Sequence, residues 1–236
     1  MNPVAIFRHF HSEGPGYFAT FLERHGIPRQ LVKIDAGDAV PPNVNAYSGL
    51  AFMGGPMSVN DDLPWIPPVL QLIRDAVAAD VPVLGHCLGG QLMSKALGGT
   101  VSRNPVKEIG WGEVTPESSD VARRWFGHAG GAFMSFHWHG ETFTIPPGAQ
   151  KLLSSAHCAN QAFALGPSLG MQCHIEMTPE MIASWCESGA REIARSSDSP
   201  GVQQVDAIKN EIAARLPQMH AVADGVYARW IENLKR

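Results

Sequence analysis

A cysteine flanked by glycines stands where the pattern of the chain changes from strand to helix. Residues 81–84 form a short apolar run typical of a buried strand, and residues 88–97 have helical periodicity. Cys87 lies between them, within the sequence GHCLGGQ of residues 85–91. A sharp strand-to-helix turn strains the backbone and leaves little room beside its central residue, which accounts for the neighbouring glycines. Free N–H groups at the helix start favour a thiolate and can hold an oxyanion, so Cys87 is a candidate nucleophile, the alternative being a small core residue.

A base and a carboxylate occur together further along the chain. Residues 168–176 read as one extended strand that contains His174 and Glu176. Because residues i and i+2 of a strand point to the same face, we expect the two side chains to project together. A carboxylate beside a histidine holds one imidazole tautomer and stabilises its cation, as nucleophilic catalysis by a cysteine requires. The alternative is an incidental polar pair at an exposed strand end.

These two motifs carry a family resemblance. GHCLGGQ at residues 85–91 and QCHIE at residues 172–176 resemble the class I (triad) glutamine amidotransferases, whose motifs are G-x-C-x-G-x-Q and Q-F-H-P-E. The similarity extends from about residue 3 to residue 185, in the order of the family, and is greatest to stand-alone domains similar to the amidotransferase half of GMP synthase. Cys173 and Ile175 stand where the family usually has Phe and Pro, and they alter only the local shape beside the histidine.

The resemblance implies a role for each of these residues. Cys87 would be the nucleophile, His174 the general base and acid, and Glu176 the carboxylate that orients it. The N–H groups of Gly55 and Leu88 would form an oxyanion hole. The glycines of the loop at residues 53–56 are consistent with backbone approaching a carbonyl, although an ordinary turn has the same composition.

Three further residues are implied as substrate contacts: Gln91, His137 and Trp138. The resemblance implies no cofactor and no metal. Two pairs of histidines at i and i+2, in RHFH at residues 8–11 and HWH at residues 137–139, have a spacing that could bind a metal, but the sequence indicates no third ligand for either. We therefore expect no metal site, and we expect the first pair to lie in a pocket wall.

Composition limits the class of protein. The chain has 236 residues, 44% of them hydrophobic, and a net charge of −4 without charged blocks. Nucleic-acid binding is not expected, because it needs clustered Lys and Arg. Neither an apolar run long enough to span a membrane nor the pattern of a signal peptide is present, so we expect a cytoplasmic protein. The four cysteines include no C-x-x-C pair, so neither a zinc site nor a disulfide framework is indicated.

Strand-like and helical segments alternate over the first hundred residues. This pattern predicts an α/β fold with a mainly parallel central sheet and helices on both faces, of the flavodoxin-like type, with the site at the carboxyl ends of the strands. Residues 98–168 suggest several short strands, some antiparallel. We expect one domain over residues 1–236, in which residues 190–236 form a helical extension that packs on the core or binds a partner.

The predicted function is cysteine-dependent hydrolysis of the γ-amide of L-glutamine or of a γ-glutamyl compound. The ammonia could pass to a separate synthase subunit, or the chain could be a free-standing γ-glutamyl peptidase. Two other hypotheses are a non-catalytic binding or regulatory module and a related fold of cysteine chaperone-hydrolases. The latter lack the H-x-E strand after the elbow, which the present chain has.

Overall fold

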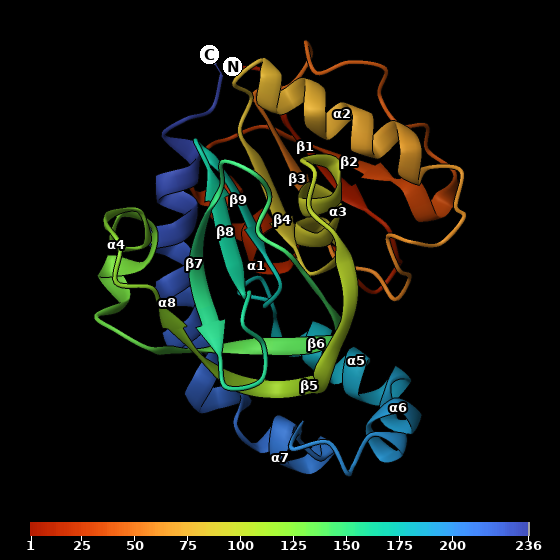
Figure 1. Ribbon diagram of the computed structural model, residues 1–236, viewed down its shortest axis with the longest axis vertical. Helices are drawn as coiled ribbons and strands as arrows, with labels where there is room; N and C mark the ends of the chain where they lie inside the picture. Colours follow the sequence, from red (N-terminus) through yellow and green to blue (C-terminus); the bar gives the residue numbers. More distant parts are fainter. Residues whose placement is uncertain (236) are drawn as a thin grey trace.

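The computed structural model describes residues 1–235, whose strands form a single ten-stranded sheet (Figure 1). One half of this sheet is parallel and runs in the order β2-β1-β3-β4-β9. Its strands are β1 (Val4–Arg8), β2 (Arg29–Lys33), β3 (Gly49–Phe52), β4 (Val83–His86) and β9 (Ser168–Met171). The predicted flavodoxin-like α/β architecture is confirmed.

The other half of the sheet is mostly antiparallel. It contains β5 (Val101–Pro116), β6 (Phe133–Phe143), β7 (Gln150–Ser155) and β8 (Ala162–Leu165), with β10 (Gly201–Val202) parallel to β5. The expectation of short strands is wrong for β5 and β6, which have 16 and 11 residues. The length of β5 could not be read from the sequence, because Pro105 interrupts the strand pattern. In the structure this proline lies where the pairing with β6 shifts register, between Arg103 and Glu108.

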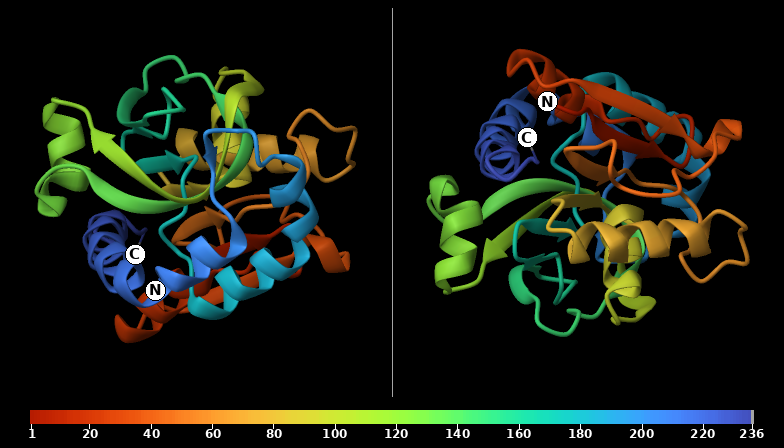
Figure 2. Two further views of the ribbon diagram at one scale, coloured as in Figure 1. Left: turned by 90° about the horizontal axis from the view of Figure 1, so that it is seen from below. Right: turned by 90° about the horizontal axis from the view of Figure 1, so that it is seen from above.

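Helices cover both faces of the parallel half (Figure 2). The helices α1 (Gly16–Arg24) and α8 (Ile212–Ile231) lie on one face, and α2 (Ile66–Ala78) and α3 (Leu88–Ala96) on the other. Strand β1 alternates accordingly: Val4 and Ile6 belong to the first core, Ala5 and Phe7 to the second. No helix within residues 1–235 has the length and apolar character needed to cross a membrane.

The remaining helices are α4 (Asp120–Phe126), α5 (Pro179–Ser188), α6 (Ala190–Arg195) and α7 (Val205–Asn210), and two short 3₁₀ helices span Ile34–Ala36 and Gly127–Ala129. Thr178 caps the N-terminus of α5: its hydroxyl oxygen accepts a hydrogen bond from the Met181 N–H at 3.3 Å. Val202, expected in a helix, instead belongs to β10. Residue 236, the end of the predicted extension, lies outside the described residues.

Helix α8 continues through Pro217 without interruption. Proline at this position removes a hydrogen bond to the carbonyl of Ala213. Both residues are exposed, so water can bind that carbonyl and the cost of the proline is small. The helix then buries Tyr227 and Trp230 completely against the sheet and α1.

Helix α3 starts unusually close to the strands from which the site is built. A Cβ added at Gly85 would lie 2.5 Å from the carbonyl carbon of Gly89. One at Gly89 would overlap the backbone oxygen of Phe52, and one at Gly90 would overlap that of Met171. The elbow therefore requires glycine at three positions because backbone packs directly on backbone.

This packing gives a prediction for stability. The Gly90→Ala substitution forces the new methyl into the β9 backbone, so the free energy of unfolding should fall by about 1–3 kcal/mol. Chemical denaturation of the purified protein measures it. Gly127→Ala is the matched control: its φ is −61° and its nearest neighbour would be the Arg123 Cβ at 3.8 Å, so it should leave stability unchanged or slightly raised. Equal losses in both variants would contradict the packing argument.

Candidate active site

Cys87 occupies the turn between β4 and α3, as the sequence predicted. Its φ is 50° and its ψ −106°, a backbone conformation that residues with a side chain rarely adopt. Its N–H donates to the Met171 oxygen at 2.8 Å, and its carbonyl accepts from the Gln91 N–H at 3.0 Å. The strained residue is thus fixed from both sides, by β9 and by the first turn of α3.

The segment that carries the histidine is not the continuous strand that was predicted. Strand β9 ends at Met171, and the following residues turn away from β4 to reach β6. There His174 forms an isolated bridge with Phe136: its N–H donates at 2.8 Å to the Phe136 oxygen, and its own oxygen accepts from the Phe136 N–H at 3.1 Å. The prediction of one strand over residues 168–176 is therefore wrong beyond residue 171.

The expected histidine–carboxylate pair nevertheless forms. Nδ1 of His174 lies 2.5 Å from Oε1 of Glu176, and both side chains are almost completely buried. The second carboxylate oxygen accepts from the Ile175 N–H at 3.0 Å and lies 3.6 Å from Nε2 of His86. The carboxylate is thus held on both oxygens, which fixes the orientation of the imidazole.

Electrostatics in this pair favour the ionised carboxylate and the imidazolium. Burial opposes the charge on Glu176, but His174 and His86 outweigh it and lower its pKa to about 2. Burial likewise opposes the cation on His174, yet the charge of Glu176, the nearby Cys87 and the hydrogen bond to Glu176 raise its pKa well above 6.5. Burial lowers the pKa of His86, although the charge of Glu176 opposes this shift.

The imidazole of His174 leaves one nitrogen unpaired in the neighbourhood of Cys87. Because Nδ1 of the imidazole is bound to Glu176, the nitrogen left for the sulfur is Nε2, which is buried and has no partner of good hydrogen-bond geometry within residues 1–235. Cys87 is still near enough to raise the pKa of the ring. The sulfur also accepts from Nε2 of Gln172 at 3.5 Å and is 3.9 Å from the Trp138 oxygen. Cys87 is 6% exposed and lines a pocket.

Gly55, one of the two residues expected to supply an oxyanion N–H, lies against the side chain of the other, Leu88. A Cβ built on Gly55 would be 2.7 Å from the end of the Leu88 side chain and 2.5 Å from the sulfur of Met57, so a larger residue would have to displace both side chains. Leu88 is the first residue of α3, and its N–H has no acceptor within the helix. Neither this N–H nor that of Gly55 has a hydrogen-bond partner in the described part of the chain. Both are free for a ligand.

The pocket beside Cys87 has a volume of about 430 Å³. Of the predicted substrate contacts, Gln91 and Trp138 line it, whereas His137 does not. Side chains alternate along β6, and His137 lines a second pocket behind the strand. Gln91 is held in place by a hydrogen bond from its Nε2 to Oε1 of Gln172 at 3.1 Å.

The pocket also contains residues that were not predicted, among them Glu13 and Trp185. Trp185 comes from α5 and stands edge-on to the His174 ring, with centroids 5.0 Å apart. Glu13 follows β1 on the loop that contains the RHFH motif, which was expected in a pocket wall. From that motif only Phe10 lines the pocket; His9 is buried and bonds through Nδ1 to the Met53 oxygen at 3.0 Å. The sequence signal that could have identified Glu13 as a site residue was its position on a loop directly after a strand.

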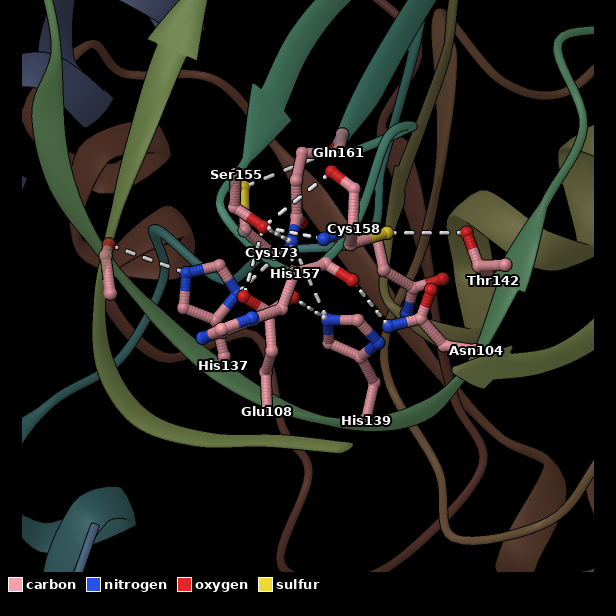
Figure 3. Close-up of polar contacts among 12 residues, drawn as sticks. Asn104, Glu108, His137, His139, Thr142, Ser155, His157, Cys158, Gln161 and Cys173 are labelled. Atoms are coloured by element: carbon pink, nitrogen blue, oxygen red, sulfur yellow. Dashed lines mark hydrogen bonds and ion pairs between the residues drawn. The ribbon is translucent and has the colours of Figure 1, made fainter. Parts of the chain in front are cut away.

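Behind β6 lies a buried polar network centred on Glu108 of β5 (Figure 3). Its carboxylate accepts from Gln161 Nε2 at 2.8 Å and Ser155 Oγ at 2.9 Å, and lies 3.0 Å from Nε2 of His139. Potential ligand atoms of Glu108, His137 and His139 all lie within 4.8 Å of one another. The expectation that the HWH histidines have no third potential ligand is therefore wrong; strand pairing supplies Glu108, 29 residues before His137.

The histidines of this network have hydrogen-bond partners within the protein. The other nitrogen of His139, Nδ1, is 2.9 Å from the Glu141 oxygen, and Nε2 of His137 is 3.0 Å from Ser135 Oγ. Burial lowers the pKa of His137 to about 4, so its ring is neutral. Paired in this way, the network anchors β6, whose Trp138 forms a wall of the pocket next to Cys87.

Comparison with known proteins relates this geometry to a family. The chain is 29% identical over 214 residues to the glutamine amidotransferase-like protein YfeJ of Salmonella typhimurium, and the match covers 88% of each. It is 35% identical over 134 residues, 55% of its length, to the glutamine-hydrolysing GMP synthase of Lactobacillus acidophilus. That match covers 24% of the synthase, so the chain corresponds to about a quarter of this relative.

A crystal structure of a glutamine amido transferase from Methylobacillus flagellatus has the same fold. The TM-score is 0.96 at 46% sequence identity, and the superposition covers 100% of this chain and 96% of that one. Residues 20–184 match the family described as glutamine amidotransferase class-I. The chain therefore belongs to the class I glutamine amidotransferases.

Proposed function

We propose that this protein hydrolyses the γ-amide of L-glutamine or of a γ-glutamyl compound through a glutamyl thioester on Cys87. His174 acts as general base and acid, and Glu176 orients it and stabilises its cation. The N–H groups of Gly55 and Leu88 bind the oxyanion. The observation that carries the proposal is the pairing of one His174 nitrogen with a buried carboxylate, which leaves the other nitrogen for the sulfur of Cys87.

The reaction proceeds in two halves. The thiolate of Cys87 attacks the γ-carbonyl carbon, and the electron pair of the carbonyl moves to the oxygen held by the two N–H groups. As that oxyanion collapses, the carbon–nitrogen bond breaks and His174 gives its proton to the leaving nitrogen. Water then attacks the thioester, His174 takes a proton from the water, and glutamate leaves as the sulfur is released.

The donor is L-glutamine in one form of this proposal. Matched relatives include GMP synthases described as glutamine-hydrolysing, so a separate synthase subunit could accept the ammonia. In the second form the chain is a free-standing γ-glutamyl peptidase. The pocket beside Cys87, with a volume of about 430 Å³ and a lining that includes Ser188 and Gly189, supports a donor whose leaving group is larger than ammonia. We expect the protein in the cytoplasm, where its four cysteines stay reduced, as they are here.

Replacing the sulfur tests the proposal. Cys87→Ser should lower kcat for glutamine and γ-glutamyl peptides by about 10³-fold or more, because a hydroxyl at this site is a far weaker nucleophile. Measurement of released glutamate gives the rates. Mass spectrometry should find a diazoketone analogue of glutamine attached to Cys87 alone, since burial raises the pKa of the other three thiols. Cys186→Ala is the matched control, and parent-like activity of Cys87→Ser would refute the mechanism.

Replacing the carboxylate tests the role of Glu176. Without its charge the imidazolium is destabilised, so Glu176→Gln should lower kcat by about 100-fold or more. The substitution also breaks a buried pair and should lower the free energy of unfolding by about 3 kcal/mol near pH 5.5. Urea denaturation at several pH values measures this difference.

The pH dependence follows from the two shifted pKa values. The folded pKa of Glu176 is depressed to about 2, so its contribution to stability is present above pH 4.5 and is lost as the pH falls toward 2. The folded pKa of His174 is raised, so its contribution is complete below pH 6.5 and is lost as the pH rises through the raised value. The stability difference between parent and variant should peak between these limits. Glu232→Gln, which breaks an exposed pair, should cost less than about 0.5 kcal/mol; a pH-independent difference for Glu176→Gln would contradict the assignment.

A further inference from the structure

The pocket at Cys87 has an unbalanced set of charges. Its formally charged lining residues are Glu13, Glu141 and Glu192, and no lysine or arginine lines it. Glu192 is neutralised from outside, because Lys107 lies 2.5 Å from one of its oxygens and Nε1 of Trp138 donates to the other at 2.9 Å. Neither Glu13 nor Glu141 has an ion-pair partner within residues 1–235. No lysine or arginine in the lining therefore balances these two carboxylates, and His174 is the cation that acts on Glu13.

Glu13 lies closest to the reacting groups. A Cβ added at Gly54 would collide with Oε2 of Glu13 and would lie 3.3 Å from Cε1 of His174, so both side chains lie against the same glycine. That glycine precedes Gly55, whose N–H faces the proposed oxyanion. Burial raises the pKa of Glu13 to about 7, with His174 opposing and Glu176 adding to the shift. Because this carboxyl is poorly solvated, an approaching cation strongly stabilises its ionised form.

Aromatic rings form the other walls. Trp138 and Trp185 meet edge to face with centroids 5.9 Å apart, and Phe10 lines the side from which Glu13 comes. Gly189 makes room for this arrangement, because a Cβ there would overlap the Trp138 ring. Indole and phenyl faces attract organic ammonium groups. Carboxylates and aromatic rings therefore favour the same kind of ligand.

We infer that the donor for this site is a γ-glutamyl amide whose leaving group carries a positively charged amine, such as a γ-glutamyl diamine. The inference rests on the proposed function and specifies its substrate class. In the proposed reaction His174 protonates the leaving nitrogen. Glu13 and His174 lie against the same glycine, Gly54, so the carboxylate of Glu13 lies on the side of the leaving group. A leaving group that ends in a carboxylate, as in a γ-glutamyl peptide, meets Glu13 and Glu141 as like charges.

The experiment compares three donors that differ in one terminal group. They are γ-glutamyl-1,4-diaminobutane, its neutral isostere γ-glutamyl-n-pentylamide, and γ-glutamyl-4-aminobutyrate, which ends in a carboxylate. The cationic donor should exceed the neutral isostere in kcat/KM by about tenfold or more, as expected for one hydrogen bond to a charged group, and the anionic donor should be poorer than both. In Glu13→Gln the ratio between cationic and neutral donors should fall toward one. Glu23→Gln, which removes an exposed carboxylate on α1, is the matched control and should keep the ratio of the parent.

Binding is measured separately, by calorimetry on the Cys87→Ala protein with the cationic donor and its neutral isostere. Tighter binding of the cationic donor, abolished by adding Glu13→Gln, supports the inference. Equal kcat/KM values for the two donors, hydrolysed by the parent and not by Cys87→Ser, would overturn the inference and leave the proposed function standing. Failure of the parent to hydrolyse any donor or glutamine would overturn the proposed function, and the calorimetric ratio would still decide whether the pocket selects a cation.

Discussion

Backbone-to-backbone packing at the start of α3 is the constraint from which the rest of this site follows. Three glycines let the helix begin directly against β3 and β9, and the residue among them is forced to a positive φ. The geometry puts a cysteine at the end of a strand with the free N–H groups of a helix beside it. Gly55 is approached by the side chain of Leu88, the first residue of the same helix. Cys87 and the proposed oxyanion donors therefore lie around the start of α3.

The antiparallel half of the sheet fixes the position of His174. His174 is attached by two backbone hydrogen bonds to β6, which belongs to the antiparallel half, whereas Cys87 belongs to the parallel half. Their separation depends on how β6 is held, and the buried network of Glu108 holds it from behind. Glu108 has a pKa that stays low in spite of burial, because His139, His137 and Ser155 compensate the loss of water. The buried network of Glu108 therefore helps to set the position of His174 relative to Cys87.

Local patterns in the sequence predicted more than contacts between distant segments. The elbow, the parallel strands and the capped start of α5 were predictable because glycine spacing, apolar runs and a capping threonine act within a few residues. The course of residues 172–176 was not, because their pairing with Phe136 is a tertiary contact that replaces strand extension. Glu108 and Glu13 were missed for the same reason, since no spacing in the sequence connects either to the histidines it approaches. The length of β5 was not predictable either, because Pro105 lies where its pairing with β6 shifts register.

The pocket is lined by residues inside and outside the stretch that matches the family model. Residues 20–184 match the family as a whole and contain Cys87, His174, Gly55 and Leu88. Glu13 comes before this stretch, and Ser188, Gly189 and Glu192 come after it, yet all four line the same cavity. Substitutions in the two flanking segments can therefore change the shape and charge of the cavity without replacing Cys87 or His174.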